Sequence, residues 1–330
     1  MQIWRNSADI PADLSRTVVT FGVFDGVHRG HHAILRRVVE IAGEREWPAV
    51  VLTFDPHPAN VHRPGQHVHL IATLEERLNR IEATGVDAVF VQHYTLDYAR
   101  ATAAEFVRKQ LAGDLHAGVV VVGEDARFGR GNEGDAALLR QLGGEAGIEV
   151  EVICDRCDED GERWSSTGVR ALLEKGDVAR AAKILGRPHR IRGTVEHGAA
   201  RGRTLGFPTA NLSGDGLGEV PADGVYAGWL VRKVAGTTAP EYLPAAISVG
   251  TNPQFDGETR TVEAHVLGRY DLNLYGEEIA IEFVSYLRPM LKLDSVEALL
   301  AQMDKDLLAT ADTLGVPPAG RVEPNKVTAS

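Results

Sequence analysis

A segment rich in glycine and histidine near the N-terminus carries the first residues that could do chemistry. The run FGVFDGVHRGHH, residues 21–32, follows a strand-like stretch and precedes a helical one. Its glycines let the backbone approach a ligand closely, and the following helix start would present unpaired amides. His28 and His31 could donate hydrogen bonds to phosphate oxygens as charge develops in a transition state. This spacing predicts phosphate handling in nucleotidyl transfer rather than a surface turn or an adventitious metal site.

A second cluster of hydroxyl groups with an arginine opens a later predicted helix. Its members are Ser165, Ser166, Thr167 and Arg170. Hydroxyl, amide and guanidinium donors at a helix start suit a pyrophosphate leaving group. Serine and threonine are also favoured helix caps, so the cluster by itself fits either role.

A longer stretch rich in glycine and arginine begins at Gly193 and reads GTVEHGAARGRTLGFPTANL. Its exposed amides, with Arg201 and Arg203, could cradle phosphates. Thr209 and Asn211 offer hard oxygen atoms, which suit a Mg²⁺ ion that also binds phosphate oxygens. A glycine-rich hairpin with a Pro-Thr turn explains the same spacing equally well.

A carboxylate stands in the alternating run VEAHV, residues 262–266. In a strand, Ala264 and the two valines would face one side, and Glu263 with His265 the other. Glu263 could then be a surface residue paired with an arginine, or a general base that faces a cavity. The alternation leaves both interpretations open.

The elements that would position the first two clusters alternate between strand and helix. Apolar runs typical of strands covered on both faces occupy residues 17–23, 49–54, 87–92, 118–122 and 148–153. Helical patterns occupy residues 31–45, 73–84, 102–112 and 134–146, two of them with capping boxes at Thr73-x-x-Glu76 and Thr102-x-x-Glu105. This alternation predicts an α/β fold with a doubly wound parallel sheet, and with ligands at the carboxyl ends of the strands.

The second half of the chain has a different pattern. After a predicted helix at residues 179–185, Gly186-Arg187-Pro188 marks a natural boundary. Strand-like runs follow at residues 191–195, 225–234, 243–249, 259–267 and 278–287. A late helix is expected near residues 294–314, with Asp294 and Glu297 as a box-like cap. We therefore expect a first domain over residues 1–186, and an antiparallel β-barrel with a C-terminal helix over residues 187–330.

The bulk composition limits the partners and the compartment. The chain has 330 residues, 44% of them apolar, and a formal net charge of −11. Such a negative surface repels a phosphate backbone, which disfavours nucleic acid as the main ligand. The N-terminus lacks an apolar signal-peptide core and no apolar run could cross a bilayer, so we expect a cytoplasmic protein with no membrane partner. The sequence leaves open whether the chain forms a homo-oligomer.

Three further patterns predict less. Cys154 and Cys157 form a single C-x-x-C, which we interpret as reduced structural cysteines rather than a redox pair or a zinc site. Histidines at positions 57, 62, 67 and 69 could hold a metal, but a solvated loop is the preferred interpretation. The G-x-G-x-x-G over residues 129–134 follows the fourth strand rather than the first, so a dinucleotide site is not expected there.

Read together, the motifs resemble those of the prokaryotic bifunctional riboflavin kinase/FMN adenylyltransferase family, the FAD synthetases. The resemblance covers nearly the whole chain, with TFGVFDGVHRGHHAIL, LTFDPHP, SSTGVR, GDVARAAKILGRPHRIRGTVEHG, RGRTLGFPTANL, VGTNPQF, VEAHVL and DLNLYG in the family's order. It implies an enzyme of flavin cofactor biosynthesis. Such an enzyme phosphorylates riboflavin to FMN with ATP, and then adenylylates FMN with ATP to give FAD and pyrophosphate, with Mg²⁺ as cofactor.

In the first domain, the resemblance implies an FMN adenylyltransferase of the nucleotidyltransferase type. His28 and His31 would contact the ATP phosphates, and catalysis would be mostly positioning and charge stabilisation, because the FMN phosphate needs little deprotonation. The other implied ATP-binding residues are Gly22, Phe24, Asp125, Ser165, Ser166, Thr167 and Arg170. The implied flavin contacts are Phe54, Pro56 and Phe128.

In the second domain, the resemblance implies a riboflavin kinase. The implied residues of its ATP and phosphate site are Gly193, Arg201, Arg203, Thr209 and Asn211, of which the last two would also hold Mg²⁺. Glu263, beside the flavin, would take the proton from the ribityl 5′-hydroxyl as this hydroxyl attacks the γ-phosphate.

Four positions depart from residues common in the family: Ala126, Asn273, Met290 and Leu293. They bear on flavin contacts rather than on the reaction. One alternative is a single-activity FMN adenylyltransferase whose barrel binds flavin for regulation. Another is a flavin store with inactive sites, which the intact motif residues argue against.

Overall fold

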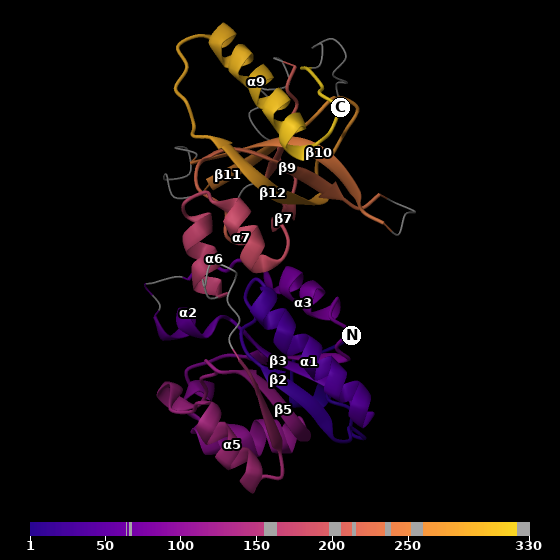
Figure 1. The fold of residues 1–330 in the computed structure, drawn as a ribbon, viewed down its shortest axis with the longest axis vertical. Coiled ribbons are helices and arrows are strands. Elements are labelled where there is room, and N and C mark those ends of the chain that lie inside the picture. The colour runs from indigo at the N-terminus through magenta and orange to yellow at the C-terminus, as the bar shows by residue number, and fades with distance from the viewer. Residues whose placement is uncertain are drawn as a thin grey trace. The chain divides into compact units, whose positions relative to one another are not determined.

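The computed structural model describes residues 1–63, 65, 68–154, 164–197, 206–212, 216–234, 239–251 and 260–321. By internal contacts the chain divides into two compact units, Met1–Leu70 with Leu74–Ser166, and Ile71–Thr73 with Thr167–Ser330. The first unit contains a parallel sheet and the second an antiparallel sheet (Figure 1). The domain boundary at residue 186 stays a prediction.

Six parallel strands form the sheet of the first unit, in the order β1-β4-β3-β2-β5-β6. They are β1 (Gln2–Trp4), β2 (Thr17–Phe21), β3 (Ala49–Asp55), β4 (Ala88–His93), β5 (Ala117–Gly123) and β6 (Glu149–Ile153). The sequence analysis did not predict β1, a three-residue edge strand that pairs with Ala88–Phe90. The strand order reverses between β2 and β5, and doubly wound sheets bind ligands beyond the carboxyl ends of the strands at such a point.

The predicted helices of the first unit are present in the expected order, together with a short helix, α2, in a segment expected to be a loop. They are α1 (Arg29–Arg45), α2 (Pro58–His62), α3 (Leu74–Glu82), α4 (Ala103–Glu105), η3 (Phe106–Asp114) and α5 (Ala136–Glu145). The capping box at Thr102 is confirmed, since its hydroxyl accepts from the Glu105 amide at 3.2 Å and the Glu105 carboxylate accepts from the Thr102 amide at 3.0 Å. The following element, η3, is a π-helix where the sequence indicated a regular helix.

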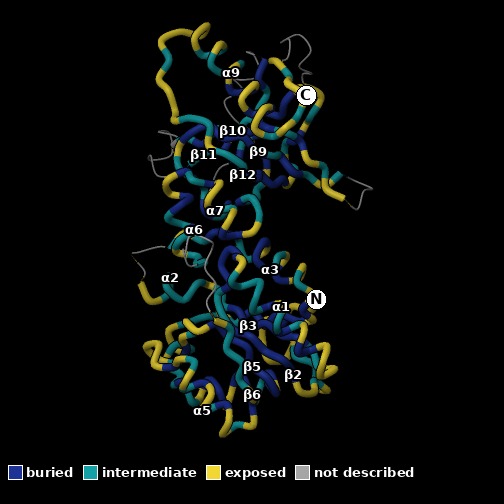
Figure 2. Tube along the Cα trace, in the orientation of Figure 1, coloured by how far each residue is buried: buried dark blue, intermediate teal, exposed yellow. Residues whose placement is uncertain are grey.

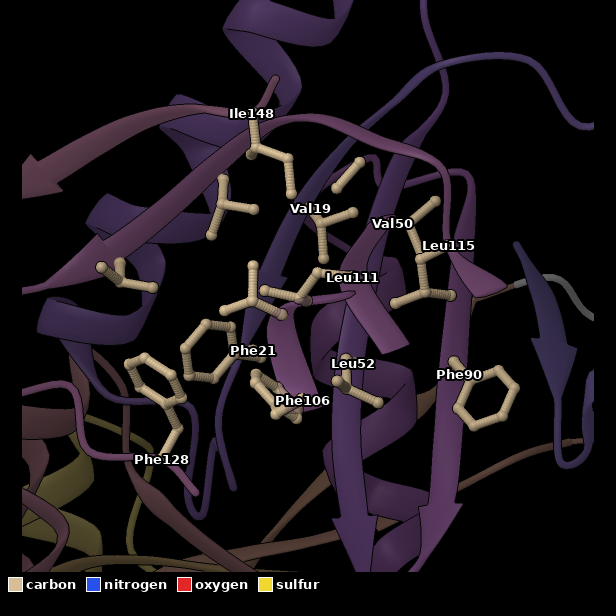
Figure 3. Close-up of a cluster of buried hydrophobic side chains, with 14 of the residues drawn as sticks. Val19, Phe21, Val50, Leu52, Phe90, Phe106, Leu111, Leu115, Phe128 and Ile148 are labelled. Atoms are coloured by element: carbon tan, nitrogen blue, oxygen red, sulfur yellow. The ribbon is translucent and has the colours of Figure 1, made fainter. Parts of the chain in front are cut away.

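Alternating side chains of these strands enter two apolar layers, one on each face of the sheet. One layer joins Val19, Val50, Leu52 and Val120 to Phe106, Leu111 and Leu139 of η3 and α5 (Figure 3). The other joins Val18, Val51, Val89 and Val121 to Leu35 and Val38 of α1 and to Leu78 and Ile81 of α3. The central strands are therefore buried on both faces (Figure 2), as their continuous apolar runs predicted.

An antiparallel sheet of six strands builds the second unit, in the order β7-β12-β9-β10-β11-β8. Its strands are β7 (His189–Thr194), β8 (Ala210–Leu212), β9 (Gly224–Arg232), β10 (Glu241–Thr251), β11 (Arg260–Val266) and β12 (Glu278–Arg288). A bridge between Glu196 and Asn211 links the ends of β7 and β8, the two edge strands. This link joins the edges of the sheet as the predicted barrel requires.

Among the described residues, three helices accompany this sheet: α6 (Ser166–Leu173), α7 (Val178–Leu185) and α9 (Val296–Leu314). Helix α9 packs on β9, β10 and β12, and Arg288 of β12 donates two hydrogen bonds to Asp306 of α9, at 2.8 and 2.6 Å. The expected cap at Asp294 is wrong: α9 begins at Val296, so Ser295 is the N-cap, and its hydroxyl accepts from the Ala298 amide at 3.1 Å. In the described part of the chain, no helix has the length and apolar character to span a membrane.

Candidate functional site

The segment between β2 and α1 forms a strained turn. Three of its residues have positive φ angles, Phe24 (54°), Gly26 (73°) and Val27 (40°). This conformation is unusual for residues other than glycine, above all for a β-branched valine. Such strain persists only where the surroundings hold the backbone, and it clusters at functional sites. The H-x-G-H motif thus begins in a turn whose conformation the rest of the unit must stabilise.

His28 and His31 are joined at the start of α1, which begins at Arg29, slightly before the predicted residue 31. His28 is the N-cap, and its Nδ1 accepts from the His31 amide at 3.4 Å. The two rings stack with centroids 3.6 Å apart. Part of His31 is exposed, but its Nδ1 is buried without a hydrogen-bond partner.

The pKa of His31 is lowered well below its ordinary value. The largest cause is burial, followed by the repulsion of the neighbouring His28 and His32. His31 is therefore a neutral imidazole at neutral pH, with a single N–H donor. A bound phosphate would favour the protonated form, so ligand binding and proton uptake at this residue are coupled.

A cavity of about 390 Å³ opens beside this turn. It brings together six residues that the sequence analysis selected: Gly22, Phe24, His31, Phe54, Asp125 and Phe128. Ala126, one of the four departures from the family, also lines it. Pro56 is absent from the lining, where its neighbour Pro58 takes part. The cavity lies among the loops that follow β2, β3 and β5, as the strand order leads one to expect.

Two tyrosines that the sequence analysis did not select form an aromatic wall of this cavity with Phe54. The Phe54 ring centroid lies 5.7 Å from that of Tyr94 and 6.2 Å from that of Tyr98, and the tyrosine rings are 5.6 Å apart. Aromatic faces and edges of this kind suit a planar ring system. The available signal was the pair of aromatic residues directly after the fourth strand, in HYTLDY.

The histidines after β3 have structural partners. His57 caps α2, where its Nδ1 accepts from the Ala59 amide at 3.1 Å, and His62 Nε2 lies 3.0 Å from the Tyr94 hydroxyl. His67 lies outside the described residues. Within the described ranges, no group of three or more histidine, cysteine, aspartate and glutamate residues is placed to hold a metal ion. Cys154 is exposed, and Cys157 also lies outside the described residues.

Close packing accounts for two of the three glycines of the G-x-G-x-x-G, whereas Gly131 has open space around it and a positive φ angle of 63°. A Cβ atom on Gly129 would lie 2.6 Å from the amide nitrogen of Ala103, and one on Gly134 would lie 2.7 Å from the ring of Phe128. A larger side chain would displace either neighbour. Gly129 also lines the cavity, so this loop forms a wall of the site.

The serine cluster is connected to the turn after β2. The Ser166 hydroxyl donates to the backbone carbonyl of Asp25 at 2.8 Å. The Arg29 guanidinium lies 5.0 Å from the ring centroid of Trp164, which precedes Ser165. Both contacts hold the start of the cluster against the H-x-G-H segment. Thr167 and Arg170 follow on α6.

A second group of candidate residues meets where β8 pairs with β11. Glu263 lies opposite Asn211 in the register, and the Thr209 hydroxyl donates a hydrogen bond to the Glu263 carboxylate. The Asn211 amide donates to the Thr209 carbonyl at 3.3 Å. A hydroxyl, an amide and a carboxylate from three separate positions of the sequence thus share one site.

A small cavity of about 50 Å³ adjoins this group and is lined by Thr209 and Asn211 among others. Gly193 does not line it; a Cβ atom there would lie 2.5 Å from a methyl group of Leu217, so this glycine is needed for packing. Arg201 and Arg203 lie outside the described residues.

Glu263 is an exposed residue and does not line this small cavity, yet the protein around its carboxylate raises its pKa. Desolvation by burial is the largest cause, and the hydrogen bond from Thr209 opposes it. A carboxylate whose pKa lies above the usual range is a stronger base than one in water. A raised pKa would suit a general base, and the exposed side chain also fits a surface residue, so both interpretations of the strand alternation stay open.

His265 is a further residue of this site that the sequence analysis did not assign to it. It is 3% exposed, and its Nδ1 lies 2.8 Å from the Pro208 carbonyl, directly before Thr209. Burial lowers its pKa, so the neutral ring uses Nδ1–H as the donor. This bond holds the segment that carries Thr209 and Asn211.

We expect His265→Leu to lower the riboflavin phosphorylation that the resemblance implies about tenfold, and stability by about 1–2 kcal/mol, because the partly buried Pro208 carbonyl loses its donor. His265→Asn, whose side chain branches at Cγ as that of leucine does, keeps an N–H close to the position of Nδ1, and its activity and stability should stay near those of the unmodified protein. Flavin chromatography and thermal unfolding of both variants check this. Equal behaviour of the two would contradict a role for the hydrogen bond.

Comparisons with known proteins assign a family to each half of the chain. Residues 10–168 match the sequence model of the FAD synthetase family, and residues 185–314 match that of the riboflavin kinase family. A Listeria monocytogenes protein named bifunctional riboflavin kinase/FMN adenylyltransferase is 35% identical over 291 residues, which are 88% of this chain and 90% of the relative. The chain belongs to the bifunctional riboflavin kinase/FMN adenylyltransferase family. The Escherichia coli member is 35% identical over 91% of this chain and 93% of its own length.

A solved structure has the same architecture. It is a crystal structure from Streptococcus pneumoniae, of a protein named as a macrolide-efflux protein, with a TM-score of 0.82 and 32% identity over 94% of this chain and 98% of its own. As a bifunctional riboflavin kinase/FMN adenylyltransferase, the present chain phosphorylates riboflavin to FMN and adenylylates FMN to FAD.

Proposed function

We propose that the cavity of the first unit binds ATP and FMN for adenylyl transfer. The observation that carries this proposal is the strained turn with stacked His28 and His31. Of the two histidines, His31 lines the cavity together with Phe24 and Asp125, at the switch point of the sheet. The FMN phosphate attacks the α-phosphate of ATP, and pyrophosphate leaves. The two histidines and the amides at the start of α1 stabilise the charge that develops. Ser165, Ser166, Thr167 and Arg170 bind the departing pyrophosphate.

The flavin ring of FMN would lie against the aromatic wall of Phe54, Tyr94 and Tyr98. Phe128, in contact with Phe21 and Phe106, closes the apolar side of the same cavity. Pro56 would contribute to flavin binding through the backbone of its loop rather than through its side chain. Planar stacking gives affinity, while the phosphate contacts set the orientation.

For the second unit, we propose that Glu263 is the general base of riboflavin phosphorylation. Its carboxylate takes the proton from the ribityl 5′-hydroxyl, whose oxygen attacks the γ-phosphate of ATP, and ADP leaves. Thr209 and Asn211 position the phosphates, with Gly193, Arg201 and Arg203 as further candidates. The hydrogen bond from Thr209 keeps the carboxylate directed into this group.

The donor set at this site fits Mg²⁺. The Thr209 hydroxyl, the Asn211 amide oxygen and the Glu263 carboxylate are hard oxygen atoms, and Mg²⁺ favours such ligands together with phosphate oxygens and water. Thr209 and Asn211 would hold the ion, which would neutralise phosphate charge when bound. We further propose that the enzyme is cytoplasmic and has no nucleic-acid or membrane partner. Whether the chain forms a homo-oligomer stays open.

Chromatography of flavins tests the two assignments. The purified protein is incubated with riboflavin, ATP and Mg²⁺, and in parallel with excess EDTA. We expect FMN first and FAD later, and neither product with EDTA. If riboflavin stayed unchanged while added FMN became FAD, the barrel would be a regulatory flavin-binding module. FMN formation at the full rate in EDTA would contradict the Mg²⁺ proposal.

A further inference from the structure

A buried arginine on α3 is not explained by the proposed reaction residues. Arg77 is 1% exposed, although its neighbours on this helix include charged residues at the surface. Burial lowers its pKa, and the nearby carboxylates of Asp25 and Asp55 partly oppose this shift. A desolvated cation is costly unless its surroundings satisfy it, and an apolar side chain of similar size would cost less. Packing of α3 against the sheet therefore does not account for an arginine here.

The guanidinium binds two backbone carbonyl groups. Nη1 donates to the carbonyl of Val23 at 2.8 Å, and Nη2 donates to the carbonyl of Phe54 at 3.2 Å. The Asp55 carboxylate is farther away, at 3.9 Å. Arg77 is thus mainly a donor to backbone, and the fork of the guanidinium can hold two acceptors at a fixed separation.

These two carbonyl groups begin the two loops at the proposed adenylyltransferase site. Val23 precedes Phe24, the first strained residue of the turn that leads to His28. Phe54 belongs to the aromatic wall and precedes the loop to Pro58. One loop is proposed to hold the ATP phosphates and the other the flavin. The Thr53 hydroxyl donates to the same Val23 carbonyl at 3.1 Å, so this carbonyl is held from two directions.

We propose that Arg77 is a positioning residue for FMN adenylylation, which holds the ATP loop and the flavin loop at the separation that the reaction needs. The inference rests on the proposed function of the cavity. Adenylyl transfer needs the FMN phosphate in line with the bond that breaks at the α-phosphate. Because each substrate is bound by a different loop, a shift of one loop relative to the other misaligns them without removing any contact to either substrate. The expected signature is therefore a lower kcat at nearly constant KM.

The test compares Arg77→Met and Arg77→Lys with a control on the same helix. Methionine has a similar length but no donor, and we expect kcat for FMN adenylylation to fall about 10²-fold, with KM for FMN and ATP within about threefold. Lysine keeps the charge but lacks the planar fork, and we expect a fall of about tenfold. The control is Arg80→Met, which removes an arginine that donates to Glu76 at 2.6 Å and touches neither loop carbonyl; its kcat should not change.

A second readout follows the backbone itself. Hydrogen exchange measured by mass spectrometry should become faster in peptides covering residues 22–28 and 54–60 together, in both Arg77 variants and not in Arg80→Met. Riboflavin phosphorylation by the same chains should stay within about twofold and serves as the internal control. If Arg77→Met does not fold, Arg77→Lys provides the test. An unchanged kcat for FMN adenylylation in Arg77→Lys would mean that Arg77 serves only the stability of the fold, and it would overturn the proposal.

Other outcomes also decide. A loss confined to KM, an equal loss in Arg80→Met, or faster exchange in only one of the two loops would overturn the positioning role. Failure of the underlying assignment is distinguishable, because His28→Ala would then keep its FAD formation. If His28→Ala loses FAD formation while both Arg77 variants keep normal kcat, only the inference on Arg77 fails.

Discussion

Replacing Glu263 with glutamine is expected to lower riboflavin phosphorylation about 10³-fold, because the amide cannot take the proton of the ribityl hydroxyl. Glutamine keeps the size of the side chain and can still accept the hydrogen bond from Thr209. FMN adenylylation should be unchanged, since the candidate residues for that step lie in other parts of the chain. Separate assays with riboflavin and with FMN as the starting flavin measure both steps on one preparation.

A glutamate elsewhere on the same sheet supplies the control. Glu278 on β12 accepts a hydrogen bond from Arg192 at 2.7 Å and belongs to neither candidate site. Glu278→Gln should keep riboflavin phosphorylation. If Glu263→Gln kept both activities, Glu263 would not be the base.

The raised pKa of Glu263 has a consequence for the dependence on pH. A base must be deprotonated, so riboflavin phosphorylation should fall, as the pH decreases, at a higher pH than the usual carboxyl range near 4.5. The stability of the fold should depend on pH in the opposite direction to the activity. The folded chain binds the proton of Glu263 more tightly than the unfolded chain does, so stability decreases as the pH rises from the pKa in the unfolded chain to the pKa in the folded chain. Glu263→Gln should therefore be at least as stable as the unmodified protein at neutral pH. A lower melting temperature would contradict the assigned cause.

Replacing His28 with alanine is expected to lower the rate of FAD formation about 10²–10³-fold, while FMN formation persists. The variant removes a phosphate donor and the ring that stacks on His31. It also removes the N-cap of α1, which is worth about 1 kcal/mol of stability. Flavin chromatography with riboflavin as substrate should show FMN that accumulates.

The variant His28→Asn separates the role of the imidazole in the reaction from the role of His28 as the N-cap of α1. Asparagine is a favoured N-cap and can accept from the His31 amide in the same way, so the helix start is kept and the imidazole is lost. Both variants should lack FAD formation if the ring takes part in the reaction. Full FAD formation in His28→Asn would reduce His28 to a cap, and full FAD formation in His28→Ala would remove the assignment of the N-terminal site.

Much of this protein could be predicted from local sequence. Strands and helices have different periods of apolar residues, so the alternation in the first half and the successive strands in the second half indicated the two sheets. The order of strand, glycine, histidine and helix start predicted that His28 and His31 lie in a turn at the start of a helix, because each of these features acts over a few residues. Short elements with weak signals, such as β1 and β8, were not predicted, and the cap of α9 was displaced by one residue to Ser295.

Only the tertiary structure decided which distant residues meet. Tyr94 and Tyr98 become a cavity wall because their loop lies beside the loop after β3. The pairing of β8 with β11 puts Asn211 opposite Glu263, and the environment of that pair raises the pKa of the carboxyl. Arg77 was not selected from the sequence, yet in the structure it is buried and donates to the carbonyl groups of Val23 and Phe54. Periodicity describes one element at a time, whereas these contacts depend on how separate elements pack, and packing acts between residues far apart in the sequence.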